Sequence, residues 1–361
     1  MTSGAQVVLA GGMPLSATIN FFTGLGWKVR TIVPADDPTM AVLEGHGLSL
    51  RLDSTIDDGA TRPGHLRILT DDPHETRPPL TAPNGTVVEF AAANPPLELP
   101  PLEEAFVLSR MAGDDAFHEG RAGMRYRDLI PGRLGGRFIA SHILIPNGGP
   151  VGDYVHYHNV RFQMIYCYRG WVTVAYEDQG DPITLHEGDC FLQPSTIRHR
   201  VLEASDRMQV IEVGCPAVHE TWGDPDTPLP TGRTLPERGY GADGHRFVHH
   251  VAATAAWAPW RLDGYEARDL GIAQATDGDA GVRVVRPLGT PAPVHERHGA
   301  EFVFTFVLDG GITLQRDGED PIRLSEGDSF VMPSATGYTL SEPSADCQLL
   351  DVTLPGAVPA A

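Results

Sequence analysis

The sequence predicts a mainly β protein in which two β-barrels follow a small α+β module with the element order βαβββ. Three observations support this prediction. A unit of about 100 residues occurs twice in the last two thirds of the chain. Short runs of strand-forming residues alternate with turn residues, and a helix-like pattern is confined to the start. The 361 residues include 40 Gly and 31 Pro, which favours many turns and short strands, and this length predicts two or three domains.

The first 92 residues are expected to form the α+β module. A short strand at Val7–Leu9 precedes the helix-like stretch SATINFFTGLG, in which Ser16 is a candidate N-cap and Gly24 or Gly26 a candidate end. Five strand-like runs follow: WKVRTIV, MAVLEG, LSLRL, LRILT and TVVEFA. The order is therefore a strand and a helix followed by several strands.

The internal repeat is clearest in two segments, GWVTVAYEDQGDPITLHEGDCFLQPSTIRH and GGITLQRDGEDPIRLSEGDSFVMPSATGY. Aligning Gly170 with Gly310 also aligns Asp-Pro-Ile, Glu-Gly-Asp and Pro-Ser in order. Each copy reads as a hairpin followed by a pair of short strands around the Glu-Gly-Asp turn, which suits a closed or double-sheet barrel. The expected domains are residues 1–92, 125–215 and 263–356, joined by a Pro-rich linker at 93–124 and a second linker at 216–262.

Composition excludes several classes of function. The chain has 27 basic and 47 acidic residues, a net charge of −20 with neutral histidine, whereas nucleic acids and anionic membranes require a basic surface. Neither a secretory signal nor a run of 18 apolar residues is present. No phosphate-binding loop or dinucleotide fingerprint occurs, so no nucleotide cofactor is implied. The cysteines lack CxxC spacing and are expected to be free thiols in a cytoplasmic protein: Cys167, Cys190, Cys215 and Cys347.

The strongest functional signal lies just before the first hairpin. His156 and His158 are two residues apart on a predicted strand, so both imidazoles point to the same face and can reach one metal ion. Gln163 follows on the next strand, and His199 comes five residues after Pro194. These residues predict a site for one divalent metal ion.

The segments GDYVHYHNVRFQMIYCYRG and GDCFLQPSTIRH resemble the two characteristic motifs of the cupin superfamily. In that family the first motif supplies His-x-His and an acidic residue, and the second supplies a last histidine, all inside a jelly-roll barrel. The resemblance covers residues 125–215 and, more weakly, residues 265–355. It implies two cupin-type jelly-roll barrels, a bicupin, with His156, His158 and His199 as metal ligands.

Gln163 stands where the family usually has glutamate. With three neutral imidazoles and an amide, a divalent ion keeps its full charge, which favours an anionic and chelating ligand such as an enolate or diketonate. Alternatively, Gln163 lies outside the ligand shell and leaves a three-histidine site with open positions. The three-histidine cupins that this site resembles include non-haem iron dioxygenases that cleave carbon–carbon bonds.

Several neighbours of the ligands are weaker candidates for substrate contact. Solvated arginines and a small buried thiol are the ordinary interpretations, and contact with a carboxylate substrate or with the cavity is the alternative. His249-His250 and His219-Glu220 lie in or beside linker-like sequence and are not expected to bind metal. The candidates for substrate contact are Tyr154, Arg161, Cys167, Arg198 and Arg200.

The second copy has lost most of the metal ligands. The repeat alignment places Glu296 and His298 at the His-x-His positions, Val303 at the position of Gln163, and Tyr338 at that of His199. Such a set is poor for iron or zinc, so this barrel is expected to provide a packing partner for the first. An off-register set remains an alternative: His295, His298 and Glu301.

The N-terminal segments NFFTGLGWKV, VPADDPTMAVLEGHGLSLRL and LTAPNGTVVEF resemble one βαβββ unit of the vicinal oxygen chelate superfamily, which includes glyoxalases. The resemblance implies a metal ligand on the first strand and a glutamate on the last. Here Glu89 is present, but Gln6 comes too early on the first strand. One unit is half of the usual pair, so a docking or dimerising module and a homodimer are expected.

Three functions follow. The leading hypothesis is a non-haem Fe(II) dioxygenase acting on a small enolisable or aromatic carbonyl or carboxylate substrate, with the metal held by the three histidines. The alternative is a non-redox isomerase, lyase, hydrolase or cyclase that uses Zn, Mn or Ni to polarise a carbonyl. A non-catalytic sensor or storage protein leaves the metal triad unexplained. For both enzyme hypotheses, the expected partner is a small anionic molecule.

Overall fold

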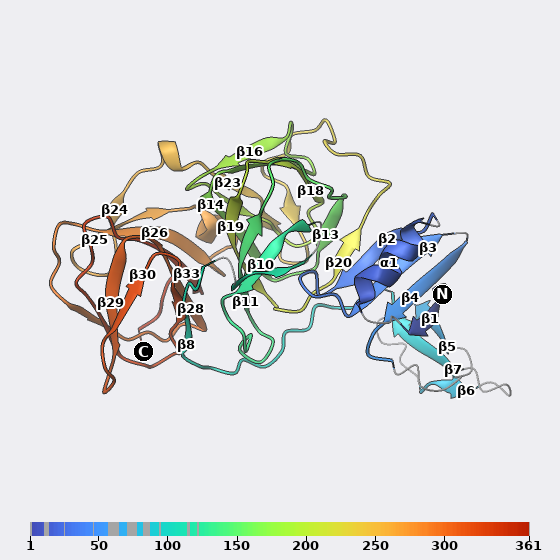
Figure 1. Ribbon diagram of the computed structural model, residues 1–361, viewed down its shortest axis with the longest axis horizontal. Helices are drawn as coiled ribbons and strands as arrows, with labels where there is room; N and C mark the ends of the chain where they lie inside the picture. Colours follow the sequence, from blue (N-terminus) through green and yellow to red (C-terminus); the bar gives the residue numbers. More distant parts are fainter. Residues whose placement is uncertain are drawn as a thin grey trace.

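The computed structural model describes residues 2–10, 14–24, 26–45, 47–56, 65–70, 78–81, 87–93, 95–113, 116–120 and 123–360. An N-terminal α+β module, a first β-barrel and a second β-barrel follow one another along the long axis of the molecule (Figure 1). The predicted fold class is confirmed. No helix among these residues is long and apolar enough to cross a membrane.

The N-terminal module has one helix packed against a sheet of strand order β2-β3-β4-β1-β5-β7-β6, in which β1 and β4 run parallel. The helix begins at Leu15, so Ser16 lies in its first turn and not at the N-cap, and it ends at Gly24 as expected. Residues 82–86, which belong to the segment LTAPNGTVVEF of the resemblance, lie outside the described residues. The elements are β1 (Thr2–Ala10), α1 (Leu15–Gly24), β2 (Lys28–Val33), β3 (Met40–Gly45), β4 (Leu48–Asp53), β5 (His65–Thr70), β6 (Leu80–Thr81) and β7 (Val87–Ala92).

The first barrel consists of two sheets of antiparallel strands. One has the order β16-β15-β18-β13 and the other the order β17-β14-β19-β11-β10. The strands are β10 (Arg125–Asp128), β11 (Ile139–Ile145), β12 (Gly149–Pro150), β13 (His156–His158), β14 (Phe162–Arg169), β15 (Trp171–Tyr176), β16 (Ile183–His186), β17 (Cys190–Leu192), β18 (His199–Ala204), β19 (Met208–Cys215) and β20 (Thr221–Gly223).

The second barrel repeats this arrangement, with sheets of order β25-β26-β33-β28-β31 and β27-β32-β29-β30. The equivalent strands pair in the same register, since Glu296 lies opposite Tyr338 as His156 lies opposite His199. Its elements are β25 (Tyr265–Asp269), α2 (Ile272–Ala275), β26 (Gly281–Pro287), β27 (Val294–Glu296), β28 (Phe302–Asp309), β29 (Gly311–Arg316), β30 (Ile322–Ser325), β31 (Ser329–Val331), β32 (Tyr338–Ser341) and β33 (Gln348–Leu354).

The two expected linkers do more than join domains. From residues 93–124, β8 pairs with β31 of the second barrel and β9 with β10 of the first. From residues 216–262, β20 and β23 both join the first barrel, and β24 joins the second. These segments therefore tie the barrels together. The remaining elements are β8 (Val107–Ser109), β9 (His118–Glu119), β21 (Gly239–Tyr240), β22 (His245–Arg246), β23 (Val248–His250), η3 (Ala252–Thr254) and β24 (Ala258–Pro259).

A hydrophobic core shared by both barrels lies between their facing sheets. Strand alternation sends every second side chain of β14 and β28 into this core, where the rings of Phe138 and Phe302 stack at 4.1 Å. The intervening residues of β14 face the interior of the first barrel: Gln163, Ile165 and Cys167. The second barrel is therefore a packing partner of the first. The shared core includes Phe162, Met164, Tyr166, Tyr168, Phe302, Phe304, Phe306 and Leu308.

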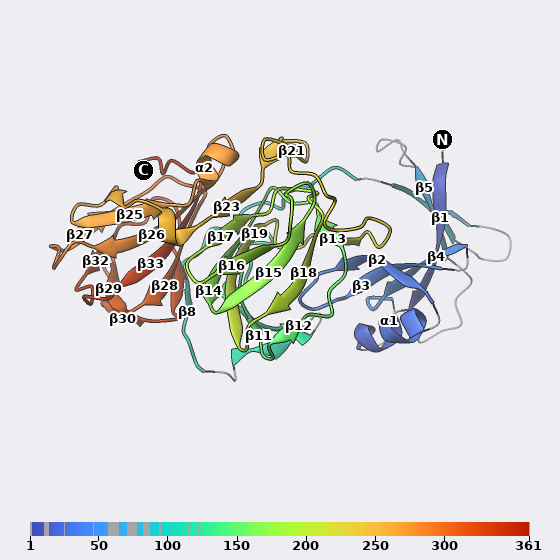
Figure 2. The same cartoon turned by 90° about the horizontal axis from the view of Figure 1, so that it is seen from above.

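The N-terminal module docks on the first barrel by strand pairing. Thr31 and Ile32 of β2 pair with Trp222 and Thr221 of β20, which continues the barrel sheet into the module (Figure 1). Figure 2 shows the module next to the first barrel from another side. Just after β2, the carboxylate of Asp36 lies 2.7 Å from the guanidinium of Arg133 in the first barrel. One free edge of the predicted half-module is thus covered by this same chain.

The stability of the barrel interface is expected to depend on pH through His142, which is 1% exposed. Burial, followed by the nearby Arg127, lowers the pKa of this imidazole from 6.5 to about 4. Between those pH values the unfolded chain binds a proton that the folded chain excludes. The free energy of unfolding therefore falls as pH falls through this window, by up to about 1.4 kcal/mol per pH unit.

Urea unfolding at pH 7 and pH 5 tests this expectation with the variant His142→Phe, whose ring fits among Phe117, Tyr168 and Phe306. The wild type should lose more stability than the variant over this interval. Replacing the exposed His118 with Phe is the control. Equal losses in the wild type and His142→Phe would contradict the assignment.

Candidate metal centre

Three histidines meet inside the first barrel. β13 carries His156 and His158 on one face, and antiparallel pairing with β18 places His199 directly opposite His156. All three are buried, and their ligand atoms lie within 4.8 Å of one another. Among the described residues this is the only group of three or more His, Cys, Asp or Glu that meets this spacing. The structure thus brings together the three residues that the motif indicated.

The second nitrogen of each ring is anchored, which selects the tautomer. The Nδ1 atoms of His156 and His199 lie 2.7 Å and 3.0 Å from the carbonyl oxygens of Tyr154 and Ile197. The Nδ1 atom of His158 lies 3.4 Å from the Glu220 carbonyl oxygen and 3.3 Å from the Thr221 hydroxyl. A carbonyl only accepts, so Nδ1 carries the proton and the lone pair is on Nε2. Three such imidazoles fit a divalent transition metal, and the triad could hold one.

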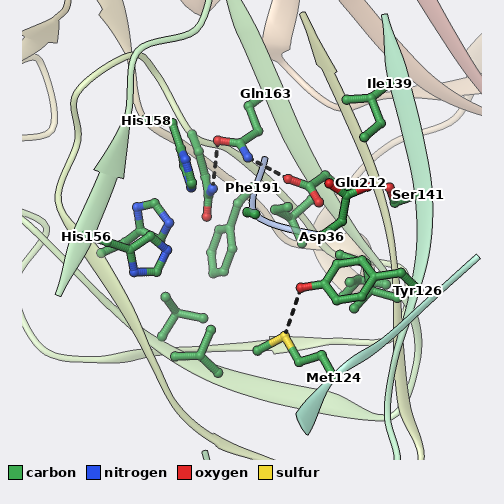
Figure 3. A pocket seen from close by; sticks show the side chains of 18 of the residues that line it. Asp36, Met124, Tyr126, Ile139, Ser141, His156, His158, Gln163, Phe191 and Glu212 are labelled. Carbon is green, nitrogen blue, oxygen red and sulfur yellow. Dashed lines mark hydrogen bonds between the residues drawn. The ribbon is translucent and has the colours of Figure 1, made fainter. Parts of the chain in front are cut away.

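Gln163 lies beside the triad in a chain of hydrogen bonds (Figure 3). Its Nε2 donates to Glu212 Oε1 at 2.5 Å, and its Oε1 accepts from Gln193 Nε2 at 3.2 Å. The Tyr176 hydroxyl in turn donates to Gln193 Oε1. Both ends of the Gln163 amide are thus held by side chains of the barrel interior.

Sequence reasoning missed Glu212 and His219, which both line the cavity at the triad. Glu212 is a lone acid in the apolar strand β19, and the repeat alignment places Asp351 at the equivalent position of β33. That recurrence is the signal that could have found it. His219, expected to be an ordinary linker residue, packs its ring 5.1 Å from the ring of His158.

The cavity is mainly apolar, with aliphatic and aromatic side chains of both sheets such as Ile143, Val174 and Phe191. The N-terminal module contributes part of its wall through residues 34–36. Its carboxylates are those of Asp36 and Glu212, and no Lys or Arg is found among the described residues that line it. The described lining therefore offers a carboxylate substrate none of the arginine contacts that the sequence left as an alternative.

The other predicted contact residues lie elsewhere. Arg161 binds Asp279 and Glu301 of the second barrel at 2.6 Å and 2.9 Å, and these hydrogen bonds hold the pKa of its guanidinium above the usual range in spite of burial. Arg198 binds Asp224 at 2.7 Å, and Arg200 is exposed. The structure gives Arg161 and Arg198 acidic partners within the protein, and none of the three arginines lines the cavity.

Cys167 and Tyr154 also lie outside the cavity lining. The thiol of Cys167 is buried against the Gly170 carbonyl oxygen at 3.3 Å, and burial raises its pKa to about 12. It is therefore a small buried residue, the ordinary interpretation. Tyr154 contributes its carbonyl oxygen to His156, so its backbone supports the triad.

The second barrel contains a different cluster at the equivalent position. Glu296 accepts from the Tyr338 hydroxyl, and the guanidinium of Arg261 lies 2.7 Å from Glu296 and 3.6 Å from Asp351. An arginine thus supplies the positive charge that a metal ion would bring. Two members of the alternative set, His295 and Glu301, are engaged with different partners. His295 pairs with Asp317, whereas Glu301 pairs with Arg137 and Arg161.

The N-terminal module shows the same absence of a metal cluster within its described residues. Gln6 donates to the Ser49 hydroxyl at 3.3 Å, whereas Glu89 lies 3.4 Å from His65 and 3.6 Å from Arg67. The two candidate ligands are therefore engaged with different partners. The module contributes its Asp36 segment to the cavity of the first barrel. The described residues of the module itself contain no cluster of metal ligands.

Comparison with known proteins agrees with this architecture. Residues 141–214 and 282–353 match the cupin domain family. The fold is similar to a salicylate 1,2-dioxygenase variant from Pseudoaminobacter salicylatoxidans in complex with gentisate, at 17% identity and a TM-score of 0.52, over 73% of this chain and 88% of that one. A variant of Bacillus subtilis oxalate decarboxylase is similar at 13% identity and a TM-score of 0.50, over 71% of this chain and 78% of that one.

A comparison with curated proteins found no match. The structural similarities are at low identity and concern the fold. The family matches, in contrast, fall on the two barrels, with the first match containing His156, His158, Gln163 and His199. Each of the two barrels therefore contains a segment that matches the cupin domain family, and both lie behind an N-terminal α+β module.

Proposed function

We propose that this protein is a non-haem Fe(II) dioxygenase that oxidises or cleaves a small enolisable or aromatic carbonyl or carboxylate substrate. The single observation that carries the proposal is the buried triad of His156, His158 and His199, with its Nε2 lone pairs directed by backbone contacts. Three histidine ligands leave coordination positions for a substrate and dioxygen, also when a fourth protein ligand is present. A bound Fe(II) would supply the redox chemistry.

The chain's own groups would bind and orient the substrate. The apolar wall around the triad excludes water and favours a compact, largely apolar molecule. An anionic group on the substrate would meet the metal ion, because no Lys or Arg of the described residues lines the cavity. Glu212 would accept a hydrogen bond from a hydroxyl or amine at the other end. The substrate class is thus a small chelating molecule with an additional hydrogen-bond donor.

Oxygen uptake tests this proposal. Protein purified and reconstituted with Fe(II) without oxygen should consume dioxygen when small enolisable ketones and hydroxylated aromatic acids are supplied. Metal analysis of the purified protein should show iron. Zinc as the sole metal, together with no oxygen uptake after iron reconstitution, would contradict a dioxygenase.

The second candidate is a non-redox isomerase, lyase, hydrolase or cyclase with Zn, Mn or Ni. One observation favours it: Glu212 and His219 place a carboxylate and an imidazole beside the triad, which suits proton transfer on a carbonyl polarised by a metal. Turnover of a substrate under strict anaerobiosis would favour this candidate over the dioxygenase.

Homodimerisation and a cytoplasmic location stay predictions. Large apolar side chains exposed on the N-terminal module support binding of a second copy of the chain: Phe21 is 62% exposed and Leu48 is 53% exposed. Light scattering at micromolar concentration should give the mass of a dimer, and a monomer alone would contradict it. A reducing compartment is supported by four buried cysteines that are all free.

A further inference from the structure

Glu212 occupies the strand next to Gln163 in the wall of the first barrel. β14 and β19 are antiparallel, with Gln163 opposite Gly214 and Ile165 opposite Glu212. Gly214 has no side chain, so the polar neighbour of Gln163 on this face is its diagonal partner, Glu212. The resulting hydrogen bond is short, 2.5 Å from Nε2 to Oε1. The barrel thus places a carboxylate directly behind the amide that replaces the usual cupin glutamate.

This contact determines which way the Gln163 amide points. A carboxylate only accepts, so the amide nitrogen faces Glu212 and the amide oxygen faces away from it. That oxygen lies on the side of His158 (Figure 3), where it also accepts from Gln193. The donors run in one direction, from the Tyr176 hydroxyl through Gln193 and Gln163 to Glu212. In such a chain each hydrogen bond polarises the next one.

The second barrel provides independent support. Asp351 stands at the position of Glu212, and it too lies on the inward face, 3% exposed at its side chain. At the place of Gln163 this barrel has Val303, and its acid lies 3.6 Å from the Arg261 guanidinium. An acid is therefore kept at this strand position in both barrels. In the barrel without a histidine triad, it faces a protein cation.

We propose that Gln163 and Glu212 together replace the single glutamate of the usual cupin site. The Gln163 amide oxygen is the fourth ligand of the divalent ion. Glu212 is a positioning residue: it orients the amide, and its negative charge lies behind Gln163 and not in the ligand shell. This inference rests on the proposed metal site of the first barrel, but not on dioxygenase activity. A neutral ligand backed by a carboxylate retains the ion while leaving its charge available to a chelating substrate.

Calorimetric titration with Co(II) at constant pH tests the proposal in the full-length protein. Glu212→Gln should weaken Co(II) binding by about 10- to 100-fold, the effect of losing a partner behind a metal ligand. The double variant Gln163→Glu with Glu212→Gln moves the carboxylate into the ligand position and should recover most of the affinity. A merely structural role for Glu212 predicts no such recovery.

Asp351→Asn is the matched control, because it makes the equivalent change in the second barrel and should leave Co(II) affinity unchanged. Circular dichroism shows whether each variant is folded, and the visible spectrum of bound Co(II) should change in Glu212→Gln. Wild-type affinity in Glu212→Gln, or equally weak binding in the double variant, would overturn the inference. Tight Co(II) binding without oxygen uptake after iron loading would overturn the dioxygenase and leave this inference intact. Absence of divalent-ion binding in the wild type would overturn both.

Discussion

Replacing His158 with alanine is expected to abolish divalent-metal binding to this protein. The three imidazoles are the ligand set that the described residues bring within 4.8 Å, and His158 is 7% exposed, so no surface side chain can take its place. Changes to partners outside the ligand shell already weaken metal binding by about 10- to 100-fold. Loss of a ligand should therefore raise the dissociation constant by more than about 100-fold and remove the metal-dependent activity.

The repeat offers a matched control for this experiment. His298 holds the position of His158 in the second barrel and is also buried, at 1% exposure. His298→Ala should cost stability through a similar cavity but leave the metal content after dialysis unchanged. The metal content is measured by elemental analysis and the affinity by calorimetry. Stoichiometric metal in His158→Ala, or its loss in His298→Ala, would place the site elsewhere.

Replacing Arg261 with methionine is expected to destabilise the second barrel by about 3 kcal/mol, the low end of the range for removing one partner of a buried ion pair. The side chain of Glu296 is 9% exposed and that of Asp351 3%, and the guanidinium near both is 23% exposed. Without it, two carboxylates share the barrel interior with no opposing charge. Desolvation of the uncompensated charges is the physical reason for the cost.

Urea unfolding followed by tryptophan fluorescence measures this loss. Arg246→Met is a control of the same chemistry, since Arg246 pairs with Glu237 at 3.3 Å on the surface, where the carboxylate side chain is 84% exposed. Such exposed pairs contribute about 0 to 1 kcal/mol. A loss in Arg261→Met no larger than that of the control would show that Arg261 does not stabilise the acids in the barrel.

The Arg261 cluster gives the second barrel a cation of its own at the place that corresponds to the histidine triad of the first. Its Glu296 and Tyr338 replace two histidines, and Val303 replaces the amide of Gln163. A divalent ion would find the Glu296 carboxylate, the His298 imidazole and the Tyr338 phenol, whereas the Arg261 guanidinium lies 2.7 Å from Glu296 and 3.6 Å from Asp351. The two acids inside the second barrel are therefore paired with Arg261. The contribution of this barrel to the rest of the protein is the hydrophobic core that it shares with the first barrel.

The sequence predicts well those features that depend on short spacing. The i, i+2 relation places His156 and His158 on one face of β13, and the same parity places Gln163, Ile165 and Cys167 inside the barrel. The repeat predicted both barrels and the loss of ligands in the second. The sequence did not predict which side chains the arginines near the ligands contact. Arg161 is close to the ligands in the chain, yet its guanidinium crosses to Asp279 and Glu301, over 100 residues away.

By itself the sequence determined the mainly β class, the repeated barrel and the histidine triad, because strand alternation and motif spacing act over a few residues. The tertiary structure decided which side chains meet across strands. It joined Glu212 to Gln163, brought His219 and Asp36 to the cavity, and gave Arg261 to the second barrel. These contacts depend on strand register and sheet closure between distant segments. No local pattern encodes that register, so the environment of the triad became visible only in the folded chain.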